Sequence, residues 1–126
     1  MKVVLDTHIL LWWLADDDHL PAEAAEAIAD PDTEVVVSAA SAWEISIWQA
    51  AGRFDAPEDL LDALAANDFG TLAITADHAV AAARLPPHHA DPFDRILIAQ
   101  AQIEDITLVS VDSRFSEYEV ELLPLD

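Results

Sequence analysis

Four short runs of β-branched and apolar residues alternate with helix-forming segments, and this alternation constrains the fold more than any other feature of the chain. The runs cover residues 2–5, 34–37, 70–74 and 107–111, and a final edge strand is expected over 118–123. Strands that alternate with helices form a parallel sheet covered by helices on both faces. The sequence therefore predicts an α/β fold, a three-layer α/β/α sandwich with a central parallel sheet of four to five strands.

The segments between these strands predict helices. Residues 7–15 are apolar almost all round, as expected for a helix that packs on both sides. The other helices are expected over 21–29, 58–66, 76–83, 91–102 and 113–116, with one more from Ser38 or Ser41 to Gly52. No linker, repeat or low-complexity segment interrupts this order. Since 126 residues suit one domain, we expect a single domain over 1–126.

The charge of the chain is strongly one-sided. Asp and Glu number 25 against 5 Lys and Arg, which gives a formal net charge of −20. Most of these acids are expected on the solvated surface. The acidity has three possible origins: a requirement for solubility, such as that of a high-salt cytoplasm, a face for a basic partner, or a metal site that uses a few of the acids. Nucleic-acid binding normally depends on a basic surface. Binding of a nucleic acid would therefore require bridging metal ions, high ionic strength or a local basic strip.

Several classes of protein are excluded or disfavoured by composition. The chain has no cysteine, so it forms neither a disulfide framework nor a thiolate metal site. It has no apolar run long enough to span a bilayer, and its first residues lack the basic start and cleavage site of a signal peptide. We therefore expect a soluble cytoplasmic protein.

Four acidic residues come from separate segments that would meet at one edge of such a sheet. In parallel sheets the working site lies at the carboxyl ends of the strands. Asp6 follows the first strand and Asp112 follows the fourth. Glu44 lies in the first turns of the helix after the second strand, and Asp94 lies near the start of the helix before the fourth. Carboxylates that converge without basic partners repel one another unless a cation holds them.

Spacing alone leaves two interpretations of these acids open. As a metal site, an all-oxygen ligand set selects the hard cations Mg²⁺ and Mn²⁺, whose natural chemistry here is phosphodiester hydrolysis. As local structure, Asp6 is a candidate helix N-cap, and Glu44 could form a capping box with Ser41. The residues around the acids favour the first interpretation.

Those surrounding residues resemble the motifs of PIN domains. Residues 3–7 (VVLDT) resemble the first motif, and residues 36–45 (VVSAASAWEI) resemble the second. Residues 89–101 (HADPFDRILIAQA) are similar to a signature of the VapC toxins of VapBC toxin–antitoxin pairs, and residues 108–112 (LVSVD) resemble the fourth motif. The resemblance covers essentially the whole chain, and the motifs follow the family's order.

The resemblance implies a metal-dependent ribonuclease, the toxin of a type II toxin–antitoxin system. The metal-binding and catalytic acids would be Asp6, Glu44, Asp94 and Asp112. Of these, Asp6 and Asp94 resemble the direct ligands of Mg²⁺ or Mn²⁺, and Thr7 and Ser110 would support the acids by hydrogen bonding. The resemblance also implies an RNA substrate, a VapB-like antitoxin whose tail occupies the pocket, and a homodimer.

Two acids near the motifs compete with this assignment. Asp91 competes with Asp94 for the third position. We favour Asp94 because it directly precedes the apolar stretch, whereas Asp91 before Pro92 suits a helix N-cap. Residues 75–77 (TAD) mimic the fourth motif, but they precede the third motif in the chain, so we expect them to start a helix.

Basic and aromatic residues allow further roles. Arg95 and Arg114 lie close to proposed catalytic acids, where each would form a salt bridge or hold an RNA phosphate. No two histidines have the helical spacing of a zinc site, and only His89, beside the third motif, is a candidate for a function. The tryptophans are expected in the core or a dimer interface, although an exposed one could stack on a base; they are Trp12, Trp13, Trp43 and Trp48.

Other classes can be compared residue by residue. A phosphoryl-transfer enzyme of the haloacid dehalogenase type requires a second Asp two residues after the first, where this chain has His8. A receiver domain requires a Lys after a late strand, and the only lysine is Lys2. One alternative stays open: a catalytically inactive PIN-fold module whose acidic pocket docks a basic antitoxin or another partner's tail.

Overall fold

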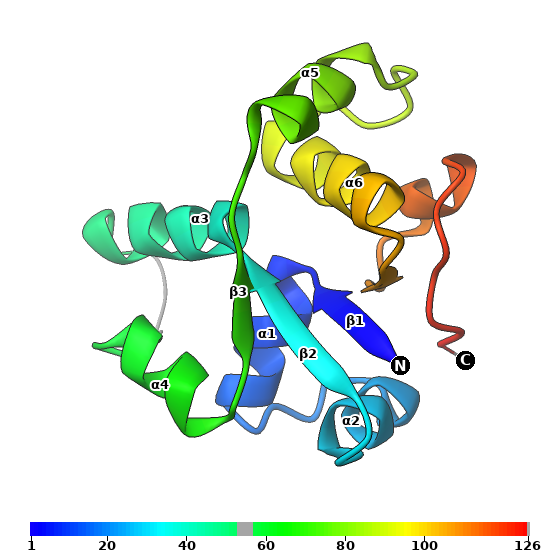
Figure 1. The fold of residues 1–126 in the computed structure, drawn as a ribbon. Coiled ribbons are helices and arrows are strands. Elements are labelled where there is room, and N and C mark those ends of the chain that lie inside the picture. The colour runs from blue at the N-terminus through cyan, green and yellow to red at the C-terminus, as the bar shows by residue number, and fades with distance from the viewer. Residues whose placement is uncertain (53–56, 126) are drawn as a thin grey trace.

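The chain folds around one parallel sheet (Figure 1), seen in a computed structural model that describes residues 1–52 and 57–125. The strands are β1 (Lys2–Leu5), β2 (Glu34–Ser38), β3 (Gly70–Leu72) and β4 (Thr107–Val109), in the order β3-β2-β1-β4. All three pairings are parallel, and Val4 of the central strand β1 is in register with Val36 and Leu108. The predicted sheet of four to five strands is confirmed with four.

Helices cover both faces of the sheet. They are α1 (Thr7–Leu14), α2 (Ala22–Ala29), α3 (Ala39–Ala50), α4 (Leu60–Ala66), α5 (Ala76–Arg84) and α6 (Pro92–Glu104), followed by the 3₁₀ helix η1 (Ser113–Glu117). Figure 1 shows α1, α2 and α4 on one side of the sheet and α5 and α6 on the other. The predicted three-layer α/β/α sandwich is confirmed.

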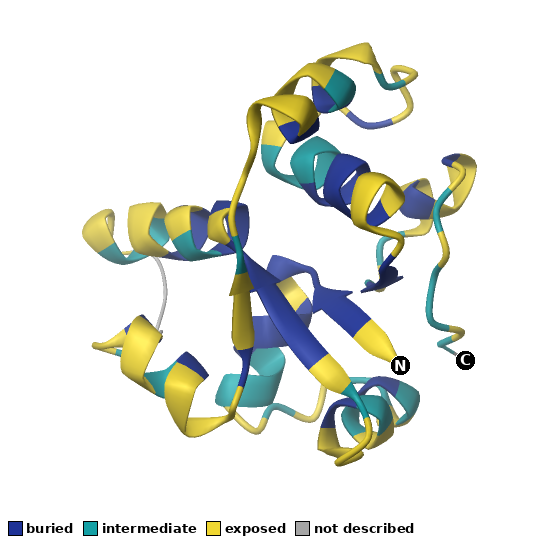
Figure 2. Cartoon of the chain, in the orientation of Figure 1, coloured by how far each residue is buried: buried dark blue, intermediate teal, exposed yellow. Residues whose placement is uncertain are grey.

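Two apolar cores lie between the sheet and its two helical layers, because successive side chains of a strand point to opposite faces of the sheet. Val3 and Leu5 of β1 face the core shared with α1 and α2, whereas Val4 between them faces the core shared with α6 and η1. Figure 2 shows β1, β2 and β4 largely buried, whereas the edge strand β3 and the outer faces of the helices are largely exposed. Burial on both faces explains why β1, β2 and β4 are almost continuously apolar.

Several segments pass into a helix through a polar N-cap. The capping side chains are Asp6 for α1, Ser38 for α3, Asp59 for α4, Thr75 for α5, Asp91 for α6 and Asp112 for η1. Residues 75–77 therefore start a helix, as predicted, and Ser38 rather than Ser41 starts α3. Three of these caps, Asp6, Asp91 and Asp112, lie beside one another at the carboxyl-end edge of the sheet.

The predicted edge strand over 118–123 is wrong. In this segment only one parallel bridge forms, between Leu108 and Leu122. The Leu108 amide donates to the Glu121 carbonyl (2.9 Å) and the Leu123 amide donates to the Leu108 carbonyl (3.0 Å). Pro124 then has no N–H with which to extend the ladder.

Other boundaries also differ from the prediction. β3 and β4 end at Leu72 and Val109, two residues early, and α6 ends at Glu104, two residues late. α4 begins at Leu60 rather than at residue 58. The cap of α4 explains its late start, because the Asp59 carboxylate accepts a hydrogen bond from the Asp62 amide (3.2 Å). Within residues 1–52 and 57–125, no helix is long and apolar enough to cross a membrane.

Candidate active site

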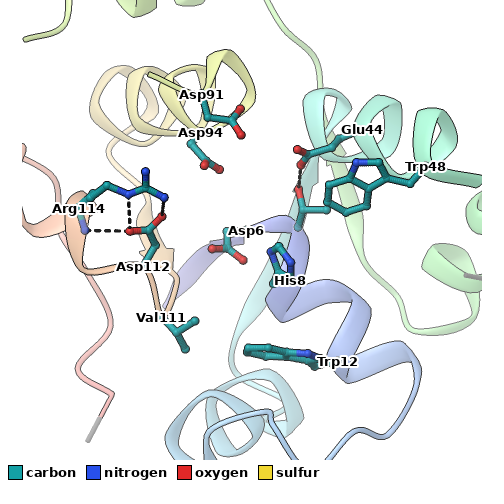
Figure 3. A pocket seen from close by; sticks show the side chains of 11 residues that line it. Asp6, His8, Trp12, Glu44, Trp48, Asp91, Asp94, Val111, Asp112 and Arg114 are labelled. Carbon is teal, nitrogen blue, oxygen red and sulfur yellow. Dashed lines mark hydrogen bonds and ion pairs between the residues drawn. The ribbon is translucent and has the colours of Figure 1, made fainter. Parts of the chain in front are cut away.

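A pocket of about 370 Å³ opens at the carboxyl ends of β1 and β4. It is lined by Asp6, Thr7, His8, Trp12, Glu44, Trp48, Asp91, Asp94, Val111, Asp112 and Arg114. Figure 3 shows these side chains reaching the pocket from α1, α3, α6 and the segment after β4. The structure therefore brings all four predicted acids together, with Asp91 as a fifth.

Asp6 lies at the floor of this pocket, between β1 and α1. Its side chain is held at both oxygens: Oδ1 accepts from the Ile9 amide (3.0 Å) and Oδ2 accepts from the Ser110 hydroxyl (2.5 Å). The residue is only 5% exposed, and this burial raises the pKa of Asp6 despite the two hydrogen bonds. Asp6 is thus both the predicted N-cap and a member of the acidic cluster.

Glu44 is held by the start of α1. The Thr7 hydroxyl donates to Glu44 Oε1 (2.6 Å) and lies 3.2 Å from the Ser41 hydroxyl. Glu44 therefore forms no capping box with Ser41, since α3 already begins at Ala39 behind the cap Ser38. Burial raises the pKa of Glu44 as well. Thr7 and Ser110 were predicted to support the acids by hydrogen bonding, and their hydroxyls donate to Glu44 and Asp6, respectively.

Asp94 has a strongly perturbed carboxyl group. Burial, followed by the negative charges of Asp91, Asp6 and neighbouring acids, raises the pKa of Asp94 to about 7. Asp91 instead caps α6, with its Oδ1 accepting from the Phe93 amide (2.9 Å). Both acids line the pocket, and the capping role predicted for Asp91 is confirmed.

Asp112, unlike Asp94, is paired with a positively charged side chain. Arg114 donates from Nε to Asp112 Oδ1 (3.0 Å) and from Nη2 to Oδ2 (2.8 Å). These charge-assisted hydrogen bonds lower the pKa of Asp112 to about 2. Arg114 thus forms the predicted salt bridge, and it does so on the wall of the pocket.

His89 connects the two sides of the cluster. Its buried ring places Nε2 2.9 Å from Asp94 Oδ2 and 3.2 Å from Asp112 Oδ2. Because Nδ1 accepts from the Asp91 amide (3.2 Å), the ring proton lies on Nε2 and is donated to these carboxylates. The sequence singled out His89 only by its position beside the third motif and gave no sign of this bridging contact.

Arg95 does not reach the pocket. Its guanidinium donates to four backbone carbonyls at 2.8–3.1 Å, those of Ala82, Leu85, Pro86 and His89. These contacts fix the loop that joins α5 to α6 and orient its donors away from the acids. Arg95 therefore forms neither the predicted salt bridge nor a contact in the pocket, and its role is structural.

The carboxylates of the pocket suit a hard divalent cation. Burial raises the pKa of three acids, Asp6, Glu44 and Asp94, and among the described residues Arg114 is the only Lys or Arg that lines the pocket. One donor atom from each of His89, Asp94 and Asp112 lies within 4.8 Å of the others. Since His89 Nε2 carries a proton, the carboxylate oxygens are the available ligands, and oxygen ligands favour Mg²⁺ or Mn²⁺.

Comparisons with known proteins agree with this geometry. The PIN domain family model matches residues 3–121. The chain is 32% identical over 119 residues to Ribonuclease VapC22 of Mycobacterium tuberculosis, which covers 92% of this chain and 91% of the relative. The fold is similar to VapBC2 from Rickettsia felis bound to a promoter DNA fragment (TM-score 0.73, 14% identity, 100% of both chains). It is also similar to a toxin–antitoxin complex from Klebsiella pneumoniae (TM-score 0.69, 18% identity, 97% and 96% of the two chains).

Proposed function

The chain belongs to the PIN domain family, and we propose on this premise that it is a metal-dependent endoribonuclease, the toxin of a type II toxin–antitoxin system. The observation that carries the proposal is the convergence of four acids from four separate segments in one pocket: Asp6, Glu44, Asp94 and Asp112. A relative whose name states ribonuclease activity supports the choice of substrate. We propose that residues 1–126 form one such domain.

Asp6 and Asp94 would bind the cation, and Glu44 and Asp112 would complete the site. When bound, Mg²⁺ or Mn²⁺ supplies Lewis-acid stabilisation of the charge that develops on a phosphoryl oxygen and lowers the pKa of water. The hydroxyls of Ser110 and Thr7 hold the carboxylates of Asp6 and Glu44 in fixed orientations. This preorganisation reduces the reorganisation needed when the RNA phosphate enters the pocket.

Arg114 is the side chain best placed to contact the RNA backbone. Its side chain is 56% exposed at the wall of the pocket, so a phosphate can approach the guanidinium while Asp112 remains paired. Guanidinium groups bind phosphate oxygens through parallel N–H donors. We therefore assign the predicted RNA-phosphate contact to Arg114 and withdraw it for Arg95.

We also propose a VapB-like antitoxin as the physiological partner, together with a homodimer. The structural relatives include toxin–antitoxin complexes, which supports a partner of this kind. A chain with a net charge of −20 attracts a basic peptide, and the acidic pocket is a complementary surface for a basic antitoxin tail.

The proposed activity is tested with the purified chain, free of any partner, and total RNA. Cleavage is measured with Mg²⁺, Mn²⁺ or EDTA, at low and high salt, for the wild type and for Asp6→Asn and Asp94→Asn. Asp77→Asn is the matched control, because Asp77 is an exposed acid in the first turn of α5 that does not line the pocket. We expect metal-dependent cleavage by the wild type and the control and none by the two pocket variants.

The same experiment tests the non-enzymatic alternative. A folded wild type that binds Mn²⁺ but cleaves no RNA under any of these conditions would favour a binding module whose acidic pocket docks a basic tail. Cleavage that persists in both pocket variants would instead show a contaminating nuclease and refute the assignment of the site.

A further inference from the structure

One wall of the acidic pocket is aromatic. His8 and Trp12 lie one turn apart on α1, and Trp48 faces them from α3 (Figure 3). The His8 ring centroid lies 6.0 Å from that of Trp12 and 5.9 Å from that of Trp48, with the rings inclined by 56° and 52°. The aromatic wall, defined as His8, Trp12 and Trp48, therefore borders the same space as the carboxylates.

Core packing alone does not account for this wall. The residues of α1 that fill the core are Ile9, Leu10 and Leu11, whereas His8 between them and Asp6 is exposed. Trp12 and Trp48 are only partly buried: both pack against the core and border the pocket, and the His19 ring stacks on Trp12 with centroids 5.8 Å apart.

The other two tryptophans have different surroundings. Trp13 packs on Phe69 and donates from Nε1 to Asn67 Oδ1 (3.0 Å), so its position is explained by the fold. Trp43 is 62% exposed on α3, where its ring meets the edge of Phe93. Neither lines the pocket, and both serve as internal controls for the aromatic wall.

The pocket offers few positive side chains for contact with RNA. Among residues 1–52 and 57–125, the pocket is lined by a single Lys or Arg side chain, Arg114, and this is paired with Asp112. Aromatic rings bind nucleobases without requiring charge, and one stacked base contributes roughly 5- to 150-fold in affinity. Stacking therefore offers binding free energy that an acidic surface does not oppose and that salt does not screen.

We propose that His8, Trp12 and Trp48 form a nucleobase subsite that binds one unpaired base of the RNA next to the phosphate held at the carboxylates. This inference rests on the proposed ribonuclease function, and it specifies the substrate. The base must be free to leave its stack, so the enzyme acts on single-stranded or looped RNA rather than on paired RNA.

The subsite is tested without catalysis by NMR, with adenosine and uridine as probes. These nucleosides have a base and no phosphate, and the indole N–H signals of the four tryptophans report separately. We expect saturable shifts of the Trp12 and Trp48 signals in metal-free protein, with the Trp13 and Trp43 signals unchanged. No shift at Trp12 and Trp48, or equal shifts of all four signals, would overturn the subsite whether or not the protein cleaves RNA.

A kinetic experiment connects the subsite to the reaction. Trp12→Leu keeps apolar contact with the core but removes the aromatic face, so we expect KM for single-stranded RNA to rise on the order of 10- to 100-fold. Trp12→Phe restores most of the affinity, and Trp43→Leu leaves KM unchanged. His8→Ala, at an exposed position where folding is not at risk, raises KM by a smaller factor.

An unchanged KM in Trp12→Leu and His8→Ala overturns the subsite while leaving the ribonuclease intact. Absence of cleavage in the wild type rejects the proposed function instead, and the NMR result still reports on the nucleosides.

Discussion

Asp94 on the α6 side of the pocket and Asp112 on the η1 side share one donor, His89, yet their pKa values move in opposite directions. Burial and surrounding acids raise the pKa of Asp94 to about 7, whereas Arg114 lowers that of Asp112 to about 2. Both carboxylates lie within hydrogen-bond distance of His89 Nε2. The position of one guanidinium thus divides a continuous acidic cluster into two electrostatically different halves.

This contrast indicates where a cation would bind most strongly. A carboxylate already paired with a guanidinium gains less from a second cation than one that repels its neighbours. Asp94 and Asp6 lie in the unneutralised half, which agrees with their proposed role as direct ligands. Asp112 lies in the neutralised half, where a supporting role is expected.

The largest expected effect is on Mn²⁺ affinity, when the negative charge of Asp94 or of Asp112 is removed. Asp94→Asn should lower the affinity for Mn²⁺ on the order of 100-fold or more, and Asp112→Asn by about 10-fold or less. Isothermal titration calorimetry at pH 7.5 measures both, with Asp77→Asn as the control for an exposed acid. Equal losses in the two variants would show that the guanidinium does not divide the cluster.

His89 provides the next largest effect, because it contacts both halves. His89→Leu should lower Mn²⁺ affinity by about 10-fold, since Asp94 and Asp112 both lose the hydrogen bond from Nε2 and only Asp112 is still held by Arg114. His89→Gln can present an amide N–H near the position of Nε2, so it should recover most of the affinity. Circular dichroism checks that both variants fold. If Gln is no better than Leu, the hydrogen bonds of His89 do not orient the acids.

The sequence predicted the strands and the convergence of the acids because both depend on local patterns. β1, β2 and β4 are short runs of β-branched and apolar residues, and the carboxyl-end rule then brings Asp6 and Asp112 to one edge. It failed over 118–123, where the alternating residues resemble a strand. There the Tyr118 hydroxyl is instead bonded to the Pro86 carbonyl (2.7 Å), and only one bridge forms.

The contacts that the sequence could not predict join different elements of the fold. One carbonyl of α5 and three of the loop before α6 surround the Arg95 guanidinium, and no local pattern indicates that they converge. The contact between His89 and Asp112 spans 23 residues and requires α6 to pack beside the segment after β4. Such contacts depend on the assembled layers rather than on the spacing of residue types.

A smaller effect is expected on stability. An Asp whose pKa is raised from its ordinary value of 3.8 to about 7 in the folded state binds more protons there than in the unfolded state. The free energy of unfolding of the metal-free protein therefore falls as pH rises from about 4 to about 7. Asp94→Asn should remove part of this fall. It should raise Tm at pH 8 by roughly 3–6 °C, about 1 kcal/mol after allowing for solvent screening, with little change at pH 4.

Thermal unfolding with EDTA at pH 4, 6 and 8 measures this difference for Asp94→Asn against the wild type. Asp77→Asn controls for the general repulsion within a chain of net charge −20, since it removes one negative charge outside the pocket. A Tm difference that is the same at all three pH values, or that is matched by Asp77→Asn, would contradict the raised pKa of Asp94.

The smallest expected effect comes from Arg114→Gln, which removes the guanidinium that distinguishes the two halves. Its side chain is 56% exposed, and exposed ion pairs contribute little to folding, so Tm should change by less than about 2 °C. The pKa of Asp112 should return toward its usual range. Mn²⁺ affinity at pH 7.5 should rise by about 2- to 5-fold, because a competing positive charge is lost. A decrease in Mn²⁺ affinity would mean instead that Arg114 orients Asp112 toward the cation, and the neutralised half would then belong to the metal site itself.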